Sequence, residues 1–135
     1  MDDKRQYELP LGELIDKITI LQLRETLLNS KEYKEDIRQL EHDIDLVMNE
    51  KNIVLNARMV RIIFIIAQLN TLIWTFKDKM GNDTNNEEYV KYLKLAHQVN
   101  GLKNALKNRL IAMECGTPRT NINTDGLEYY VSIWE

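Results

Sequence analysis

Residues 57–80 read ARMVRIIFIIAQLNTLIWTFKDKM, and this stretch decides the fold. Apolar side chains occupy nearly every face of a helix drawn through it, and residues 62–67 form its longest uninterrupted apolar run. A helix that is apolar on all sides is usually a core helix. We therefore expect residues 56–80 to form a buried helix that ends at Gly81, on which the rest of the chain packs.

Three further stretches space their apolar residues as helices do. The first runs from about residues 10–12 to Leu28, and Ser30 is the expected N-cap of the second, which ends near residues 49–52. The last covers residues 87–114. Because only 5 Gly and 2 Pro occur in 135 residues, the sequence favours long helices and few loops. The predicted fold is all-α, a bundle of about four long helices with a buried third helix.

The last predicted helix carries a heptad-like apolar seam. The seam consists of Tyr89, Leu93, Ala96, Val99, Leu102, Leu106, Leu110 and Met113. Lys103, Lys107, Asn108 and Arg109 fall on the other faces of this helix. The second predicted helix carries another apolar seam, formed by Tyr33, Ile37, Leu40, Ile44 and Val47. Together with the strongly apolar first helix, the two long seams favour a homo-oligomer, a dimer or larger. The alternative is a single four-helix bundle that buries all these faces by itself.

The C-terminal tail, residues 116–135, differs from the rest of the chain. A turn signal at residues 123–126 is followed by several large apolar side chains, among them Tyr129, Tyr130 and Trp134. Periodicity leaves both a short strand and a short helix open for this segment. Left uncovered it would form an exposed apolar patch, so we expect it to pack on the bundle or on a partner subunit, within a single helical domain of residues 1–135.

Composition excludes several classes of protein. The 18 basic and 21 acidic residues give a net charge of −3, without the basic excess of nucleic-acid-binding proteins. Cys115 is the single cysteine, which precludes an internal disulfide and favours a reducing compartment. Neither a signal peptide nor an apolar run of membrane-spanning length is present. We expect a soluble cytoplasmic protein without nucleic-acid or membrane partners.

The sequence contains no recognisable catalytic or cofactor motif. His42, His97 and Cys115 lack the spacing of a metal site, and neither a glycine-rich phosphate loop nor a Ser/His/Asp arrangement occurs. We therefore expect no metal and no cofactor, and we favour a non-enzymatic role.

Glu13, Asp16 and Lys17 lie within one turn of the first predicted helix, where side chains three and four apart share a face. Such a cluster can bind a cation or a phosphate, or position a proton transfer. The favoured alternative is structural: the carboxylates stabilise the helix start and form an ion pair with Arg58 or Arg61.

Residues 12–21, GELIDKITIL, resemble the opening motif of a family of small uncharacterised proteins of bacteria and their phages, which reads G-E-x-I-D-K-[LI]-[ST]-I-L. The likeness continues at residues 72–74 with Asp78, at Asn100, at residues 107–109 and at residues 128–130. This chain departs from the family in the acidic stretch after the tryptophan, where it has Lys77 before Asp78, and in the tail. The resemblance implies a helical fold but no reaction. It marks as candidate ligand-binding residues Glu13, Asp16, Lys17, Trp74, Asp78 and Arg109.

Two functions are consistent with these features. The favoured one is a helical interaction or accessory protein that acts as a homo-oligomer, because apolar helix surface is abundant. The alternative is a small-ligand-binding protein or an enzyme acting on a phosphorylated or carboxylated metabolite. Helical bundles host both kinds of function, so fold class does not separate them.

Overall fold

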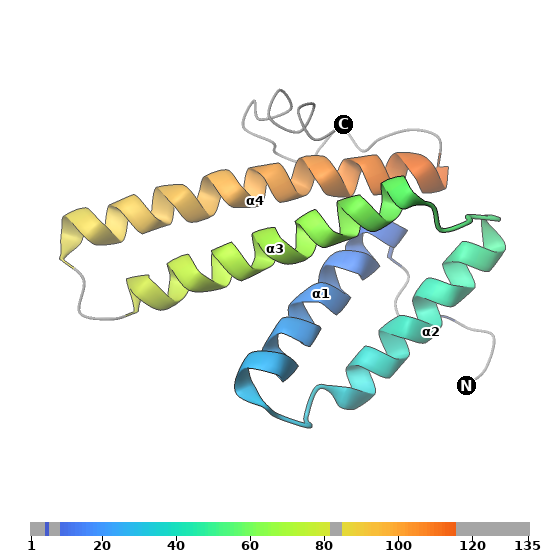
Figure 1. Cartoon of the computed structure of the whole chain (residues 1–135), viewed down its shortest axis with the longest axis horizontal. Coiled ribbons are helices and arrows are strands. Elements are labelled where there is room, and N and C mark those ends of the chain that lie inside the picture. Colours follow the sequence, from blue (N-terminus) through green and yellow to red (C-terminus); the bar gives the residue numbers. More distant parts are fainter. Residues whose placement is uncertain (1–4, 6–8, 82–84, 116–135) are drawn as a thin grey trace.

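A computed structural model describes residues 5, 9–81 and 85–115 of the chain. These residues form four helices: α1 (Leu11–Leu28), α2 (Lys34–Glu50), α3 (Ala57–Met80) and α4 (Asn86–Cys115). The predicted all-α bundle of four long helices is confirmed (Figure 1). The predicted packing of the tail concerns residues 116–135, which lie outside the described part of the chain.

The helices form two antiparallel pairs that cross. α3 and α4 run side by side along the long axis of the molecule, and the α1–α2 pair lies across them (Figure 1). α1 packs against each of the other three helices. Within the described residues, α1 is the one helix whose backbone lies close to the backbone of α2. α1 therefore joins the two pairs.

The ends of α1, α3 and α4 lie within one residue of the predicted positions. Hydrogen bonds to side chains stabilise the first turns of α3 and α1. The Asn56 side chain caps α3 by accepting the backbone N–H of Met59 at 2.9 Å. At the start of α1, which follows Pro10, the backbone N–H of Leu11 donates to Glu114 Oε2 of α4 at 2.6 Å. The first turn of α1 is thus attached to the last turn of α4.

The predicted N-cap of the second helix is wrong. α2 begins at Lys34, and its cap position is Tyr33 rather than Ser30. The Ser30 hydroxyl instead accepts the backbone N–H of Glu32 at 3.3 Å, inside the turn between α1 and α2. Serine forms such local bonds in turns as readily as at helix caps, so sequence does not separate the two.

All four helices contribute to one apolar core. Its buried members are Leu11, Leu14, Ile15, Leu40, Val47, Met59, Ile62, Ile66, Leu69, Ala105, Leu106 and Leu110. α3 supplies four of them, but it is covered on one side only, since Phe64 is 64% and Leu72 43% exposed. The predicted seam of α4 is likewise open at its ends, where Tyr89 and Met113 are exposed.

By length and composition alone, α3 is apolar enough to cross a membrane, a test that core helices of soluble proteins also pass. In this bundle Ile62, Ile66 and Leu69 of α3 are buried in the core. Its exposed surface includes Arg61, Gln68 and Thr71, alongside Phe64. The exposed surface of α3 is therefore mixed in polarity rather than uniformly apolar.

Gly12 allows α1 and α4 to approach closely. A Cβ atom at this buried position would lie 2.8 Å from the backbone oxygen of Lys107 and 3.2 Å from the Ile111 side chain. A backbone oxygen cannot move aside as a flexible side chain can. The crossing of α1 over α4 therefore requires the smallest residue here.

We predict that Gly12→Ala lowers the free energy of unfolding by about 1–3 kcal/mol, the usual cost of overpacking a tight contact. Thermal unfolding of the purified variant measures the change, and the melting temperature should fall by several degrees. Gly81→Ala is the matched control, because its Cβ would meet nothing closer than 3.5 Å and its φ is −82°. A Gly12→Ala variant as stable as Gly81→Ala would contradict this account of the crossing.

Candidate functional site

Asp16 of α1 lies at the meeting point of α1, α3 and α4, where it is only 7% exposed. Its Oδ1 atom accepts a hydrogen bond from Asn70 Nδ2 of α3 at 2.9 Å and lies 3.3 Å from Lys103 Nζ of α4. Its Oδ2 atom lies 3.2 Å from Lys107 Nζ. One carboxylate therefore contacts two ammonium groups and one amide.

Further contacts close this arrangement into a network. Lys103 Nζ donates to Asn70 Oδ1 at 3.0 Å, and Asn70 Nδ2 also donates to the Thr19 hydroxyl at 2.8 Å. Lys107 Nζ pairs with Glu13 Oε1 at 3.1 Å. We call the six residues the Asp16 network: Glu13, Asp16, Thr19, Asn70, Lys103 and Lys107.

The charges in the Asp16 network balance, with two carboxylates facing two ammonium groups. Balance matters here because an unpaired buried charge is strongly destabilising. Burial lowers the pKa of Lys103 below its ordinary value, while Asp16 acts in the opposite direction. The positive charges of Lys107 and Lys77 lower this pKa further. Lys103 thus lies among other cations as well as beside Asp16.

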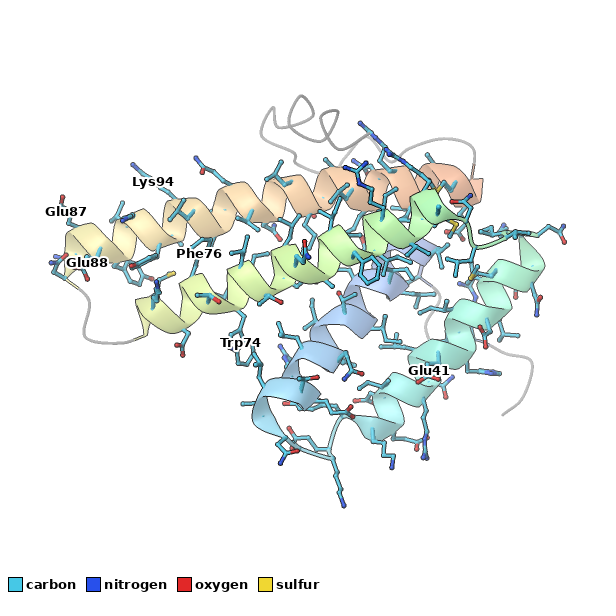
Figure 2. The ribbon with its side chains drawn as sticks, in the orientation of Figure 1. Glu41, Trp74, Phe76, Glu87, Glu88 and Lys94 are labelled. Carbon is cyan, nitrogen blue, oxygen red and sulfur yellow. The ribbon has the colours of Figure 1, made fainter. Side chains whose placement is uncertain are left out.

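An open groove of about 370 Å³ adjoins the network between α1, α3 and α4. Its lining residues are Ile20, Leu23, Arg24, Asn70, Ile73, Trp74, Lys77, Asp78, Asn100 and Lys103. Asn70 and Lys103 are buried and form its inner wall, whereas Arg24 and Lys77 are exposed at its rim. Figure 2 shows Trp74 projecting from α3 toward α1, on the side of the groove. Asn70 and Lys103 belong to both the network and the groove.

Positive charge predominates in the groove. Arg24, Lys77 and Lys103 line it with a single carboxylate, Asp78. Among the described residues, neither Arg24 nor Lys77 forms an ion pair. Asp16 forms an ion pair with Lys103 outside the groove. When its charge is included, the groove still carries an excess of positive charge.

The structure brings most of the predicted site residues to this region. Glu13 and Asp16 belong to the Asp16 network, and Trp74 and Asp78 line the groove. Lys17 is exposed, and neither it nor Arg109 is among the residues lining the groove. The expected ion pair of these carboxylates with Arg58 or Arg61 is not the arrangement at Asp16, whose cationic partners are Lys103 and Lys107. Glu13 pairs with Lys107 as well.

Sequence reasoning did not identify Asn70, Lys103 and Lys107 as site residues. The two lysines do lie outside the apolar seam of α4, as predicted, but α1 covers that face and leaves them 7% and 8% exposed. Their spacing of four residues was a usable signal, since such side chains share one helix face. Asn70 was a second signal, as a polar residue beside the buried Leu69 in the most apolar helix.

Metal ligands are not clustered in the described part of the chain. No group of three or more His, Cys, Asp or Glu side chains there could hold a metal ion. His42 lies on α2 and His97 on α4, and these two helices do not pack closely on each other.

No family model, curated protein or solved structure matches this chain. Function must therefore be inferred from the Asp16 network and the groove themselves.

We predict that Asp16→Ala lowers the free energy of unfolding by about 3 kcal/mol or more, because it leaves Lys103 and Lys107 buried without their shared carboxylate. Urea unfolding followed by circular dichroism measures the loss. Asp45→Ala, at an exposed position of α2, is the control and should change stability by no more than about 0.5 kcal/mol. Equal effects of the two substitutions would show that the network does not stabilise the fold.

Proposed function

We propose that the protein binds a small anionic ligand, with a phosphate or carboxylate group held in the groove between α1, α3 and α4. The observation that carries this proposal is the convergence of Arg24, Lys77 and Lys103 on one groove. These three cations come from three different helices, so only the folded chain assembles them.

The geometry of Lys103 supports anion binding. Its ammonium group is held by Asp16 and Asn70, so little side-chain freedom remains to be lost when a ligand binds. The positive charge of Lys77 lowers the pKa of Lys103, which means that the two cations repel each other across the groove. A bound anion would offset this repulsion and would raise the pKa of Lys103.

The rest of the groove suits an organic ligand rather than a bare ion. Ile20, Leu23, Ile73 and Trp74 provide apolar surface beside the cations. The volume of about 370 Å³ lies within the range of small-molecule sites, which combine apolar walls with a few polar groups. The Arg24 guanidinium at the rim can contact a phosphate or carboxylate with two hydrogen bonds at once.

A fluorescence titration with phenyl phosphate tests this proposal. Phenyl phosphate carries both an anionic group and an apolar ring. Its binding in the groove should quench the fluorescence of Trp74. Because the sequence contains a second tryptophan, Trp134, the titration uses Trp134→Phe as the parent protein. We expect saturable quenching and, at about 100 times the dissociation constant, a rise in melting temperature of about 5 °C or more.

Arg24→Gln should weaken phenyl phosphate binding about tenfold or more, because it replaces a charged, two-bond contact with a neutral amide. The matched control is Arg38→Gln, since Arg38 is an exposed arginine of α2 that does not line the groove. Absence of saturable binding in the parent protein, or equal weakening by both substitutions, would contradict the proposed function.

A second candidate is the interaction protein that acts as a homo-oligomer. Large apolar side chains on the surface support it: Val54 and Leu55, between α2 and α3, are 79% and 54% exposed, and Phe64 of α3 is 64% exposed. Such side chains often lie in subunit contacts. Binding of a ligand and self-association do not exclude each other.

We predict that size-exclusion chromatography with light scattering gives a mass of at least two chains of 15.9 kDa at micromolar concentration. Replacing Val54 and Leu55 together by lysine should shift the mass toward that of one chain, because charge opposes burial in a contact. A wild-type protein that remains monomeric at all accessible concentrations would exclude this second candidate.

A further inference from the structure

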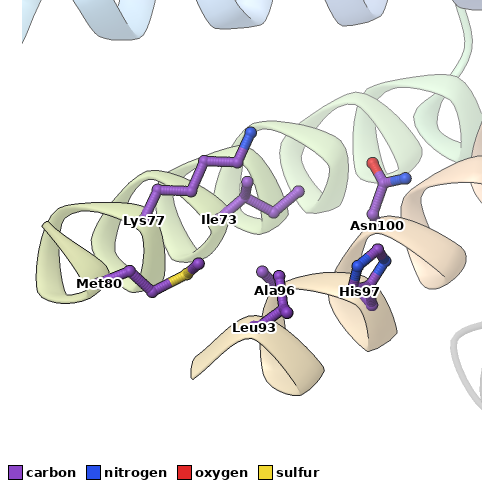
Figure 3. A pocket seen from close by; sticks show the side chains of 7 residues that line it. All are labelled: Ile73, Lys77, Met80, Leu93, Ala96, His97 and Asn100. Atoms are coloured by element: carbon purple, nitrogen blue, oxygen red, sulfur yellow. The ribbon is translucent and has the colours of Figure 1, made fainter. Parts of the chain in front are cut away.

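A second cavity of about 210 Å³, which is open to solvent like the groove, continues the groove along α3 and α4. Three of its lining residues, Ile73, Lys77 and Asn100, also line the groove. Met80 extends it along α3, and Leu93, Ala96 and His97 form the wall on α4 (Figure 3). The two spaces therefore meet at a shared end that carries Lys77 and Asn100.

Apolar side chains form the larger part of the cavity wall, which consists of Ile73, Met80, Leu93 and Ala96 together with the polar Lys77, His97 and Asn100. Ala96 stands where neighbouring positions of the α4 seam carry Val99 and Leu102, and its short side chain leaves room beside Ile73. The Phe76 ring of α3, labelled in Figure 2, stacks on the Tyr92 ring of α4 at 6.2 Å between centroids.

The polarity of the lining residues changes from the groove to the far end of the cavity. The groove end carries Arg24 and Lys103, whereas Met80 and Leu93 line the far end, with His97 as the additional polar side chain. On α3 the lining runs from Asn70 to Met80, which corresponds to about 15 Å of helix. The site is thus elongated, cationic at one end and largely aliphatic at the other.

We propose that the ligand is an amphipathic anion, whose phosphate or carboxylate occupies the groove and whose unbranched alkyl chain lies in the cavity between α3 and α4. This inference rests on the proposed function and adds the class of ligand to it. An extended alkyl chain fits the space and buries against Ile73, Leu93 and Ala96.

Isothermal titration calorimetry of the full chain with ethyl, butyl, hexyl and octyl phosphate tests the inference. Each phosphate is used below its micelle-forming concentration. Each methylene buried in the cavity should raise affinity about two- to fourfold, until the cavity is filled. The same increment should vanish when the cavity is altered, while ethyl phosphate, which occupies the groove alone, should bind as before.

Leu93→Asp places a charge on the wall of the cavity and should abolish most of the gain from ethyl to octyl phosphate. Leu93 is 36% exposed, so the fold should tolerate this change. Val90→Asp, one turn earlier on α4 and 45% exposed, lines neither the groove nor the cavity and is the matched control. Ala96→Leu is a second variant, which fills the cavity without adding charge.

The outcomes separate the inference from the proposed function. Equal affinity of the wild-type protein for ethyl and octyl phosphate would overturn the inference and leave anion binding in the groove intact. A gain with chain length that persists in both Leu93→Asp and Ala96→Leu would also overturn it, because the chain would then lie elsewhere, for example between two copies of the protein. Failure of every phosphate to bind would remove the proposed function and the inference together.

Discussion

Burial of one carboxylate between two lysines constrains the whole arrangement of helices. Asp16 is buried, and three side chains contact its carboxylate: Lys103, Lys107 and Asn70. Burying charges is costly, and apolar side chains of similar size often give equal or greater stability. The polar network adds specificity, because the hydrogen bonds and ion pairs of Asp16 can form only when α1 lies at one position along α3 and α4. We therefore regard the Asp16 network as the feature that fixes how the α1–α2 pair crosses the α3–α4 pair.

The crossing in turn produces the groove. Gly12 and the bond from Leu11 to Glu114 hold the start of α1 against the end of α4. Farther along, Leu23 and Arg24 of α1 and Trp74 of α3 line the groove rather than the apolar core. Lys103 lies on the boundary, held by the network on one side and facing the groove on the other. The interaction that orders the fold thus also supplies the innermost cation of the proposed ligand site.

Sequence patterns predicted the helices better than their contacts. The spacing of apolar residues gave the extents of α1, α3 and α4, because periodicity is a local property. It did not show that α3 is covered on one side only, since Phe64 looks the same in sequence whether buried or exposed. The carboxylates Glu13 and Asp16 were singled out, but their lysine partners lie about 90 residues away on α4. Pairing across helices depends on packing, which sequence spacing does not encode.

A double-mutant cycle between Asp16 and Lys103 tests the central claim most directly. The free energies of unfolding of the wild-type protein, Asp16→Asn, Lys103→Met and the double variant are measured by urea denaturation. If the buried pair orders the helices, the two substitutions should be coupled by at least about 1 kcal/mol, with the double variant more stable than the sum of the single losses predicts. Additive losses, within about 0.3 kcal/mol, would show that the two side chains act independently and would contradict the account.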